Sequence, residues 1–355
     1  MFKVSRHFYA QEQGGADMKK VYAALAFLLA AASAVYGNAQ DKLLLKAVTQ
    51  RNVTAGRIQK LLKAGADVNA RNEDGLSVLT LAISYGRNPE IISALIEAGA
   101  NVNDRDDDSP LAAAICENTS EVVRLLVKAG ADVNARYGGL GQTALMLSVT
   151  SEYEDTLILI EAGADVNARN DLGDTALMHA SGEFSDPDTV KALIKAGADV
   201  NARSLDGSTA LMWAAVIAEE EDMNRAMIEL LVRSGANVNA RDSMGRTALM
   251  YAAGNLQGVV GMEGSSPVES AKILIEAGAD VNAATNDGAT ALMLASGNID
   301  SEILKEYGED NARPAIVKAL LEAGADPAVR DNMNRSAINY ARNSGIRRIL
   351  LHAAK

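Results

Sequence analysis

The chain has 355 residues, of which 48% are hydrophobic and 23% charged, so it is long enough to bury a sizeable core. It carries 34 basic and 46 acidic residues, and this formal net charge of −12 argues against a general binder of nucleic acid or anionic membranes. Cys116 is the only cysteine, which excludes an intramolecular disulfide.

Residues 18–39 have the features of a secretory signal peptide. Met18 and two lysines form a basic start, residues 21–36 are largely apolar, and small residues follow as far as Ala39. We expect cleavage after Ala39, with Ala34 as the alternative site. Retention of the segment as a membrane anchor is a further alternative, although the apolar run is shorter than the ~18 residues that usually span a bilayer.

Residues 1–17 lie ahead of this basic start. A signal peptide begins close to its basic residues, so we expect translation to start at Met18 and residues 1–17 to be a spurious extension. Codons for Gln13, Gly14 and Gly15 can contain a purine-rich ribosome-binding sequence at a suitable distance from Met18. Together these features predict a bacterial protein that is exported.

Two short motifs recur along residues 41–355. The first is Gly-Ala-Asp or Gly-Ala-Asn, which begins at Gly65, Gly99, Gly130, Gly163, Gly197, Gly235, Gly278 and Gly324. The second is Thr-Ala-Leu-Met, which begins at Thr143, Thr175, Thr209, Thr247 and Thr290. Successive glycines of the first motif are 34, 31, 33, 34, 38, 43 and 46 residues apart. A period near 33 with these motifs resembles the ankyrin-repeat family, in which Thr-Pro-Leu-His usually stands where this chain has Thr-Ala-Leu-Met.

The residues at each position of the repeat suit the local structure that is expected there. The Thr175 hydroxyl can cap the first helix, and a second helix carries apolar residues at helical spacing, such as Val190 and Leu193. Gly197 can end the second helix because glycine adopts the left-handed conformation without a steric penalty. The resemblance implies an all-α fold, an ankyrin-repeat solenoid of helix-turn-helix units with short hairpin loops and about nine repeats.

The later repeats depart from the regular period between their two helices. From the leucine of Thr-Ala-Leu-Met to the next closing glycine the count rises to 24, 29 and 32 residues, against 18 earlier in the chain. The extra residues fall in enlarged inter-helix loops at 217–222, 254–267 and 297–314. Loops of this length in a compact repeat are often functional, so a functional role and a connecting role both stay open.

Residues that could carry catalysis are few. After the signal peptide the sequence has only His179 and His352, and it lacks a Ser/His/Asp set, a metal-spaced His/Cys cluster and a phosphate-binding loop. We therefore expect a protein that is not an enzyme and has no cofactor. One column of methionines invites a second interpretation, as a copper(I) ladder or an oxidation sensor, although packing between helices is favoured. The column consists of Met146, Met178, Met212, Met250 and Met293.

Two further columns point to a binding surface. Arginine recurs at the base of the hairpins and is interrupted by Ala284. It follows Asn-Ala at Arg71, Arg136, Arg169, Arg203 and Arg241, and it stands at the equivalent positions Arg105 and Arg330. These arginines either contact a partner or pair with nearby carboxylates such as Asp171, Asp206 and Asp242. On the first helix a second column reads Leu147, His179, Trp213, Tyr251 and Leu294.

Apolar residues also stand near hairpin tips that are polar in most ankyrin repeats. They lie in the same repeats as the bulky aromatics, and Trp, Tyr and Arg dominate binding energy at interfaces. Core packing is the alternative for the two aromatic residues. The expected partner-binding residues are Arg169, Leu172, Arg203, Leu205, Trp213, Arg241, Met244 and Tyr251.

The resemblance to ankyrin-repeat proteins implies a non-catalytic scaffold that binds a protein partner through the concave groove and the hairpin tips. We expect a monomer exported from a bacterial cell, either periplasmic or extracellular, with no nucleic-acid partner and no stable membrane insertion after signal cleavage. A secreted effector that acts on host proteins is the alternative. A third interpretation is a metal or ligand carrier that uses the methionine and aromatic columns, because fold alone does not fix function.

Overall fold

A computed structural model describes residues 39–104, 109–117, 119–182, 186–216, 221–254, 267–297, 313–341 and 343–355. The expected signal peptide before Ala39, the expected extension at 1–17, Arg105 and the greater part of the three enlarged loops lie outside these residues. The chain forms two units, Met1–Asn101 and Val102–Lys355.

The first unit contains four described helices. They are α2 (Ala39–Val48), α3 (Ala55–Lys63), α4 (Val78–Ser84) and α5 (Pro89–Glu97). Helix α2 packs against α3 and α4, and α5 packs against α3 and α4. Apolar side chains from each of the four helices, among them Leu44, Ile58, Leu79 and Ile92, are fully buried and form the core of this unit.

The second unit continues the pairing of helices. Its helices are α6 (Pro110–Cys116), α7 (Ser120–Lys128), α8 (Ala144–Ser148), α9 (Tyr153–Glu161), α10 (Ala176–Gly182), α11 (Pro187–Lys195), α12 (Ala210–Ala214), α13 (Glu221–Arg233), α14 (Ala248–Gly254), α15 (Pro267–Glu276), α16 (Ala291–Ser296), α17 (Pro314–Glu322), α18 (Ala337–Tyr340) and α19 (Ser344–Ala353). Strands β1 (Arg136–Tyr137) and β2 (Gln142–Thr143) pair antiparallel within one hairpin.

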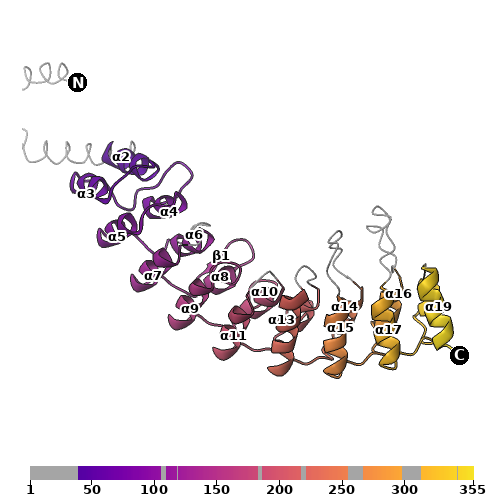
Figure 1. Ribbon diagram of the computed structural model, residues 1–355. Coiled ribbons are helices and arrows are strands. Elements are labelled where there is room, and N and C mark those ends of the chain that lie inside the picture. The colour runs from indigo at the N-terminus through magenta and orange to yellow at the C-terminus, as the bar shows by residue number, and fades with distance from the viewer. Residues whose placement is uncertain are drawn as a thin grey trace, which may run out of the picture. The chain divides into compact units, whose positions relative to one another are not determined.

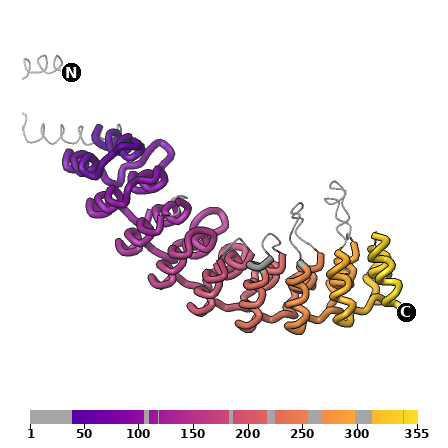
Figure 2. The backbone as a smooth tube through the Cα atoms, viewed as in Figure 1, coloured from indigo at the N-terminus to yellow at the C-terminus, as the bar shows by residue number. Residues whose placement is uncertain are grey.

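The helices of the second unit lie in two rows. The first helices of the pairs, from α6 to α18, contact one another in sequence order, and so do the second helices from α7 to α19. Figures 1 and 2 show these pairs side by side, with the row from α7 to α17 along one side and the row from α6 to α16 along the other. We call the first helix of each pair inner and the second helix outer. Among the described residues, no helix is both long and apolar enough to cross a bilayer.

Local sequence signals set the ends of the helices. The Met178 amide donates a hydrogen bond to Thr175 Oγ1 at 3.4 Å, which confirms the expected cap at the start of an inner helix. Pro267 and Pro314 occupy the first turn of α15 and α17, where a missing N–H costs nothing. Gly197 has φ +97°, so the expected left-handed end of the second helix is confirmed.

The core follows the repeat. The leucine four residues before each closing glycine is fully buried in every complete outer helix that the structure describes from α5 onward: Leu95, Leu126, Leu159, Leu193, Leu231, Leu274 and Leu320. The methionine column is equally buried, which confirms that these side chains pack between helices. Cys116 is different. It is the last residue of α6 and is exposed.

A ladder of asparagine side chains joins each repeat to the next. The Asn167 amide donates to the Gly197 carbonyl at 3.0 Å, and its Oδ1 accepts from the Asp199 backbone at 2.7 Å. The second unit repeats this pair of bonds at Asn103, Asn134, Asn201, Asn239 and Asn282. Each ladder bond satisfies backbone groups at the end of an outer helix, and so fixes where the following hairpin begins.

Candidate protein-binding surface

The hairpins of the second unit are hydrogen-bonded to one another near their tips. The Leu205 amide donates to the Leu172 carbonyl at 2.8 Å, and the Asn286 amide donates to the Met244 carbonyl at 2.9 Å. Gly173 permits this approach, because it has φ +78° and an added Cβ would lie 2.9 Å from the Leu205 amide nitrogen. The tips are therefore held in a fixed register along the row of repeats.

Apolar side chains project from these tips. Leu172 is 48% exposed, Leu205 79% and Met244 58%, which confirms their expected position at the surface. The sequence interpretation missed two more, Leu140 and Met333, which are also exposed. The signal was present, because each stands directly before the turn residue Gly141 or Asn334, as Leu172 stands before Gly173. We refer to Leu140, Leu172, Leu205, Met244 and Met333 as the apolar tips.

The arginine column ties neighbouring repeats together. Arg169 donates to the backbone carbonyl of Arg203, and Arg203 donates in the same way to that of Arg241. Arg136 and Arg241 continue the series with the carbonyls of Arg169, at 2.7 Å, and Ala284. The arginines remain exposed, so each presents part of its guanidinium to solvent beside the tips.

Pairing with carboxylates, the alternative to partner contact for these arginines, is found in part among the described residues. Asp171 pairs with Arg136 of the preceding repeat, whereas the Asp242 carboxylate is buried and pairs with Arg246 at 2.6 Å. Asp206 accepts from Ser204 and Ser208 within its own hairpin. Arg136 thus contacts both a backbone carbonyl and a carboxylate of the next repeat.

Trp213 lies at the edge of the inner helices. Its side chain is half-buried, and its ring meets that of His179 edge-on, with centroids 5.6 Å apart and an interplanar angle of 68°. A Cβ added to Gly182 would fall 2.3 Å from Trp213 Cε3, so the indole packs directly on the backbone at the end of α10. Trp213 thus combines a packed face with an accessible one, which suits an interface anchor.

Tyr251 occupies the equivalent position on α14 but lacks the accessible face of Trp213. Its side chain is only 4% exposed, its hydroxyl donates to Asp242 Oδ2 at 2.8 Å, and the Arg246 guanidinium carbon lies 4.8 Å from its ring centroid. Burial, followed by the hydrogen bond to Asp242, raises the pKa of Tyr251 above its ordinary value. This burial favours core packing, the alternative for Tyr251, over the expected contact with a partner. We call the arrangement of Asp242, Arg246 and Tyr251 the Asp–Arg–Tyr clamp.

A second Asp–Arg–Tyr clamp occurs in the last repeat. Tyr340 donates to Asp331 Oδ2, Arg335 Nε lies 2.9 Å from the same oxygen, and the guanidinium carbon lies 4.7 Å from the Tyr340 ring. Burial raises the pKa of Asp331, but the hydrogen bonds from Tyr340 and Arg335 outweigh it and lower the pKa to about 2. Both clamps have the sequence spacing Asp-x₃-Arg-x₄-Tyr, so the hairpin base and the inner helix are joined in the same way twice.

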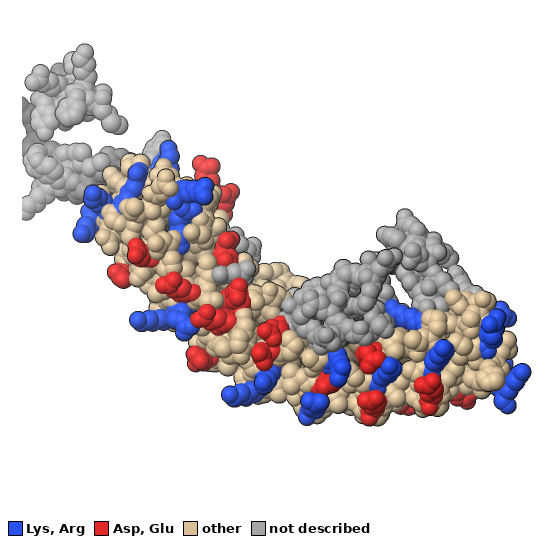
Figure 3. Space-filling model, in the orientation of Figure 1, with Lys and Arg blue, Asp and Glu red and all other residues tan. Residues whose placement is uncertain are grey.

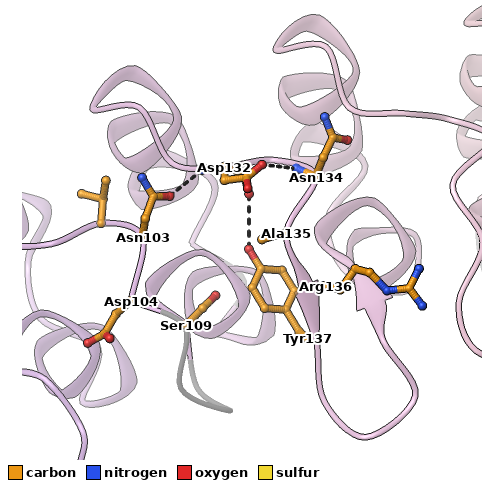
Figure 4. Close-up of a pocket in the computed structure, with 9 residues that line it drawn as sticks. Asn103, Asp104, Ser109, Asp132, Asn134, Ala135, Arg136 and Tyr137 are labelled. Carbon is orange, nitrogen blue, oxygen red and sulfur yellow. Dashed lines mark hydrogen bonds between the residues drawn. The ribbon is translucent and has the colours of Figure 1, made fainter.

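A polar cavity of about 390 Å³ lies beside the hairpin that contains β1. In Figure 4 the Tyr137 hydroxyl points toward Asp132, while Asn103 and Asn134 each meet Asp132 through a hydrogen bond. Burial raises the pKa of Tyr137, partly offset by Ser109. Asn103 Oδ1 is engaged in the connection between repeats, and Asp132 Oδ1 accepts from the Asn134 amide within its own loop. This lining therefore supports the fold and points to no ligand.

Charges are mixed over the surface that Figure 3 shows. Along the helices of the second unit, Lys and Arg side chains lie among Asp and Glu side chains, and no single basic field covers that face. Among the described residues, no group of three or more His, Cys, Asp or Glu side chains is placed to hold a metal ion.

Paired helices joined by hydrogen-bonded hairpins define a helical repeat protein. A family model of ankyrin repeats in three copies matches residues 44–137, 138–204 and 177–262, and a model of the single ankyrin repeat matches residues 244–286 and 287–332. These matches extend over well more than half of the sequence. The chain belongs to the ankyrin-repeat family, and ankyrin repeats generally mediate protein–protein interactions.

A solved structure supports the same fold. The chain is similar to the ankyrin repeat domain of Bcl-3, described as a unique member of the IkappaB protein family, with 28% sequence identity and a TM-score of 0.52. The similarity covers 69% of this chain and 99% of that domain. A search of curated proteins gave no match.

Proposed function

We propose that this protein is a non-catalytic scaffold that binds a protein partner along the hairpins of the second unit, where the apolar tips lie. The observation that carries the proposal is the apolar tips. Four of them, Leu140, Leu172, Leu205 and Met244, lie on successive hairpins, and exposed apolar side chains grouped in this way mark an interaction surface. Fixed spacing between the tips means that a partner meets a preformed surface, which lowers the entropy cost of binding.

The arginines and Trp213 complete this surface. Arg169, Arg203 and Arg241 flank the tips and suit carboxylates on the partner, while Trp213 supplies a half-buried aromatic anchor. Of the residues first assigned to the surface, Tyr251 is removed. The partner that fits is a protein whose contact region is apolar with acidic residues at its edge.

The proposal can be tested by crosslinking at a tip. A photo-crosslinking amino acid in place of Leu205 should capture a partner in cells, whereas the same amino acid in place of Leu351 should not. Leu351 is a matched control, because it is an exposed leucine on α19 and belongs to no hairpin. Equal capture at both positions, or none at either, would remove the tips from consideration.

Substitutions can then distinguish a loss of partner contact from a loss of stability. Leu172→Ser and Leu205→Ser should weaken capture without changing stability, because both side chains are exposed. Trp213→Ala should weaken binding by more than about 1 kcal/mol. Arg203→Glu is a less clean test, since Arg203 also bonds the Arg241 carbonyl and its loss would loosen two repeats.

We further propose that the protein is exported from a bacterial cell as a monomer, with residues 18–39 removed. The support is the sequence order of basic, apolar and small residues at 18–39. N-terminal sequencing of the protein from cell fractions tests this proposal. A mature chain that begins at Gln40 in the periplasm or medium supports it, and an intact Met18 or Met1 in the cytosol contradicts it.

A further inference from the structure

A second hollow lies on the row of outer helices, away from the hairpins. It has a volume of about 440 Å³ and lies between α9 and α11. Tyr153, Leu157 and Ile160 line it from α9, and Lys191 and Lys195 line it from α11. We call it the α9–α11 groove. None of its lining residues belongs to the apolar tips or the inner helices, so it is separate from the surface described above.

Leu157 departs from the pattern of the other outer helices. It stands six residues before the closing Gly163 and is only half-buried. The residues at the same distance before the other closing glycines are all polar or charged: Gln59, Ser93, Arg124, Lys191, Glu229, Lys272 and Lys318. The repeat therefore folds without an apolar side chain at the position of Leu157, and this position is not part of the core.

Other apolar atoms surround Leu157. Tyr153 is exposed at the first turn of α9, Ile160 is half-buried one turn further along than Leu157, and Ala192 faces them from α11. Two lysines on α11 border this apolar floor with their long aliphatic stems. The groove therefore has an apolar floor and a basic edge.

The lysines of that edge are not held in tight ion pairs by the residues that the structure describes. Lys191 lies 3.8 Å from Asp188, and both side chains are mostly exposed, so this pair is loose. Lys195 makes no ion pair with any residue that the structure describes. On α9, Glu154 is held by Arg124 at 2.7 Å and is not among the lining residues. The edge is therefore basic apart from Asp188.

We propose that the α9–α11 groove is a second protein-docking site and that it takes an amphipathic helix with an acidic border. A groove between two neighbouring helices accepts the side-chain ridge of a third helix, with apolar residues at i, i+3 or i+4, and i+7. Those side chains fill the floor around Leu157, and Asp or Glu side chains beside them reach Lys191 and Lys195. This site is independent of the function proposed for the apolar tips.

A displayed library of helical peptides tests the proposal. The full-length mature protein serves as bait, and binders to the Leu157→Lys variant are removed. This variant should fold normally, because Lys191, Lys272 and Lys318 occupy the same position in other outer helices. We expect the surviving peptides to carry an apolar stripe flanked by Asp or Glu, and to bind Leu157→Lys at least about ten-fold more weakly than wild type.

Individual peptides then locate the contact. The double variant Lys191→Glu, Lys195→Glu should also weaken them several-fold, with a strong dependence on salt. Lys272→Glu, at the position of Leu157 in α15, is the matched control and should bind as wild type. Leu205→Ser should also bind as wild type, which separates this site from the apolar tips.

Several results would overturn the proposal. One is a selection that yields no peptide able to distinguish wild type from Leu157→Lys, and another is an enrichment of basic peptides. Sedimentation analysis tests whether a second copy of this chain fills the groove instead. A wild-type dimer that Leu157→Lys converts to monomer would show that it does.

Discussion

Replacing Tyr251 by Phe isolates one hydrogen bond of an Asp–Arg–Tyr clamp. The phenyl ring keeps its buried position and its contact with Arg246, and only the hydroxyl that donates to Asp242 is lost. Asp242 is buried, so water cannot replace the missing donor there. The change therefore removes one bond from a carboxylate while leaving the packing in place.

The expected loss in the free energy of unfolding follows from the hydrogen bonds that the Asp242 carboxylate keeps. Hydrogen bonds to charged groups contribute about 1.5–3 kcal/mol to the free energy of unfolding. Asp242 Oδ2 retains its bond from Arg246 Nε at 2.6 Å, so we expect the lower half of that range, about 1.5–2 kcal/mol. Tyr340→Phe removes the equivalent bond of the second clamp and should cost a similar amount.

Urea unfolding at neutral pH measures the loss. Fluorescence of the single Trp213, on α12 next to α14, reports on the repeat beside the first clamp, and circular dichroism reports on all helices. Tyr85→Phe is the control, because Tyr85 is half-exposed and should change stability by less than ~0.5 kcal/mol. A loss of less than ~0.5 kcal/mol for Tyr251→Phe would refute the reasoning, as would zero coupling to Asp242→Asn in a double-mutant cycle.

Three other predictions concern the repeat itself. Leu193→Ala should lower the free energy of unfolding by about 2–5 kcal/mol in urea titrations, because the side chain is fully buried; a loss below ~1 kcal/mol would contradict the assigned core. Gly197→Val should cost about 1–3 kcal/mol and lower Tm, since the left-handed φ of +97° strains a β-branched residue although no atom lies within 4 Å of the added Cβ. Asp331, whose pKa is lowered to about 2, stabilises the fold above its unfolded pKa of about 3.9, and this contribution should be lost as the pH falls from about 4 to 2. Denaturant titrations across that range should show a steeper acid loss for wild type than for Asp331→Asn, and equal slopes would contradict the assignment.

Local features were predictable from the sequence because short-range physics fixes them. The closing Gly197, the Thr175 cap and the buried Leu193 each follow from a conformational preference, a hydrogen bond within one turn or the helical spacing of apolar residues. Repetition at a fixed period then identified the family, because independent positions agreed in repeat after repeat. The methionine column was placed correctly for the same reason.

The tertiary structure decided how equivalent positions in the repeat differ. Trp213 and Tyr251 occupy the same place on their inner helices, yet one is half-buried and the other almost fully buried. The residue five positions earlier differs between the two: Arg246 closes a clamp over the Tyr251 ring, whereas Ser208 stands at that place before Trp213. The sequence alone gives the same prediction for such equivalent positions, although their exposure differs.

Contacts between repeats account for the remaining differences. The arginines donate to the carbonyl of the following repeat, which is 34 residues away for Arg169, and no local pattern reveals such a bond. The groove around Leu157 likewise depends on α11, whose lysines lie more than 30 residues further along the chain. The sequence by itself determined the repeat, its helix ends and its core, because those depend on neighbours in the chain. Only the tertiary structure decided which side chains remain accessible, because accessibility depends on the neighbouring repeats against which they are stacked.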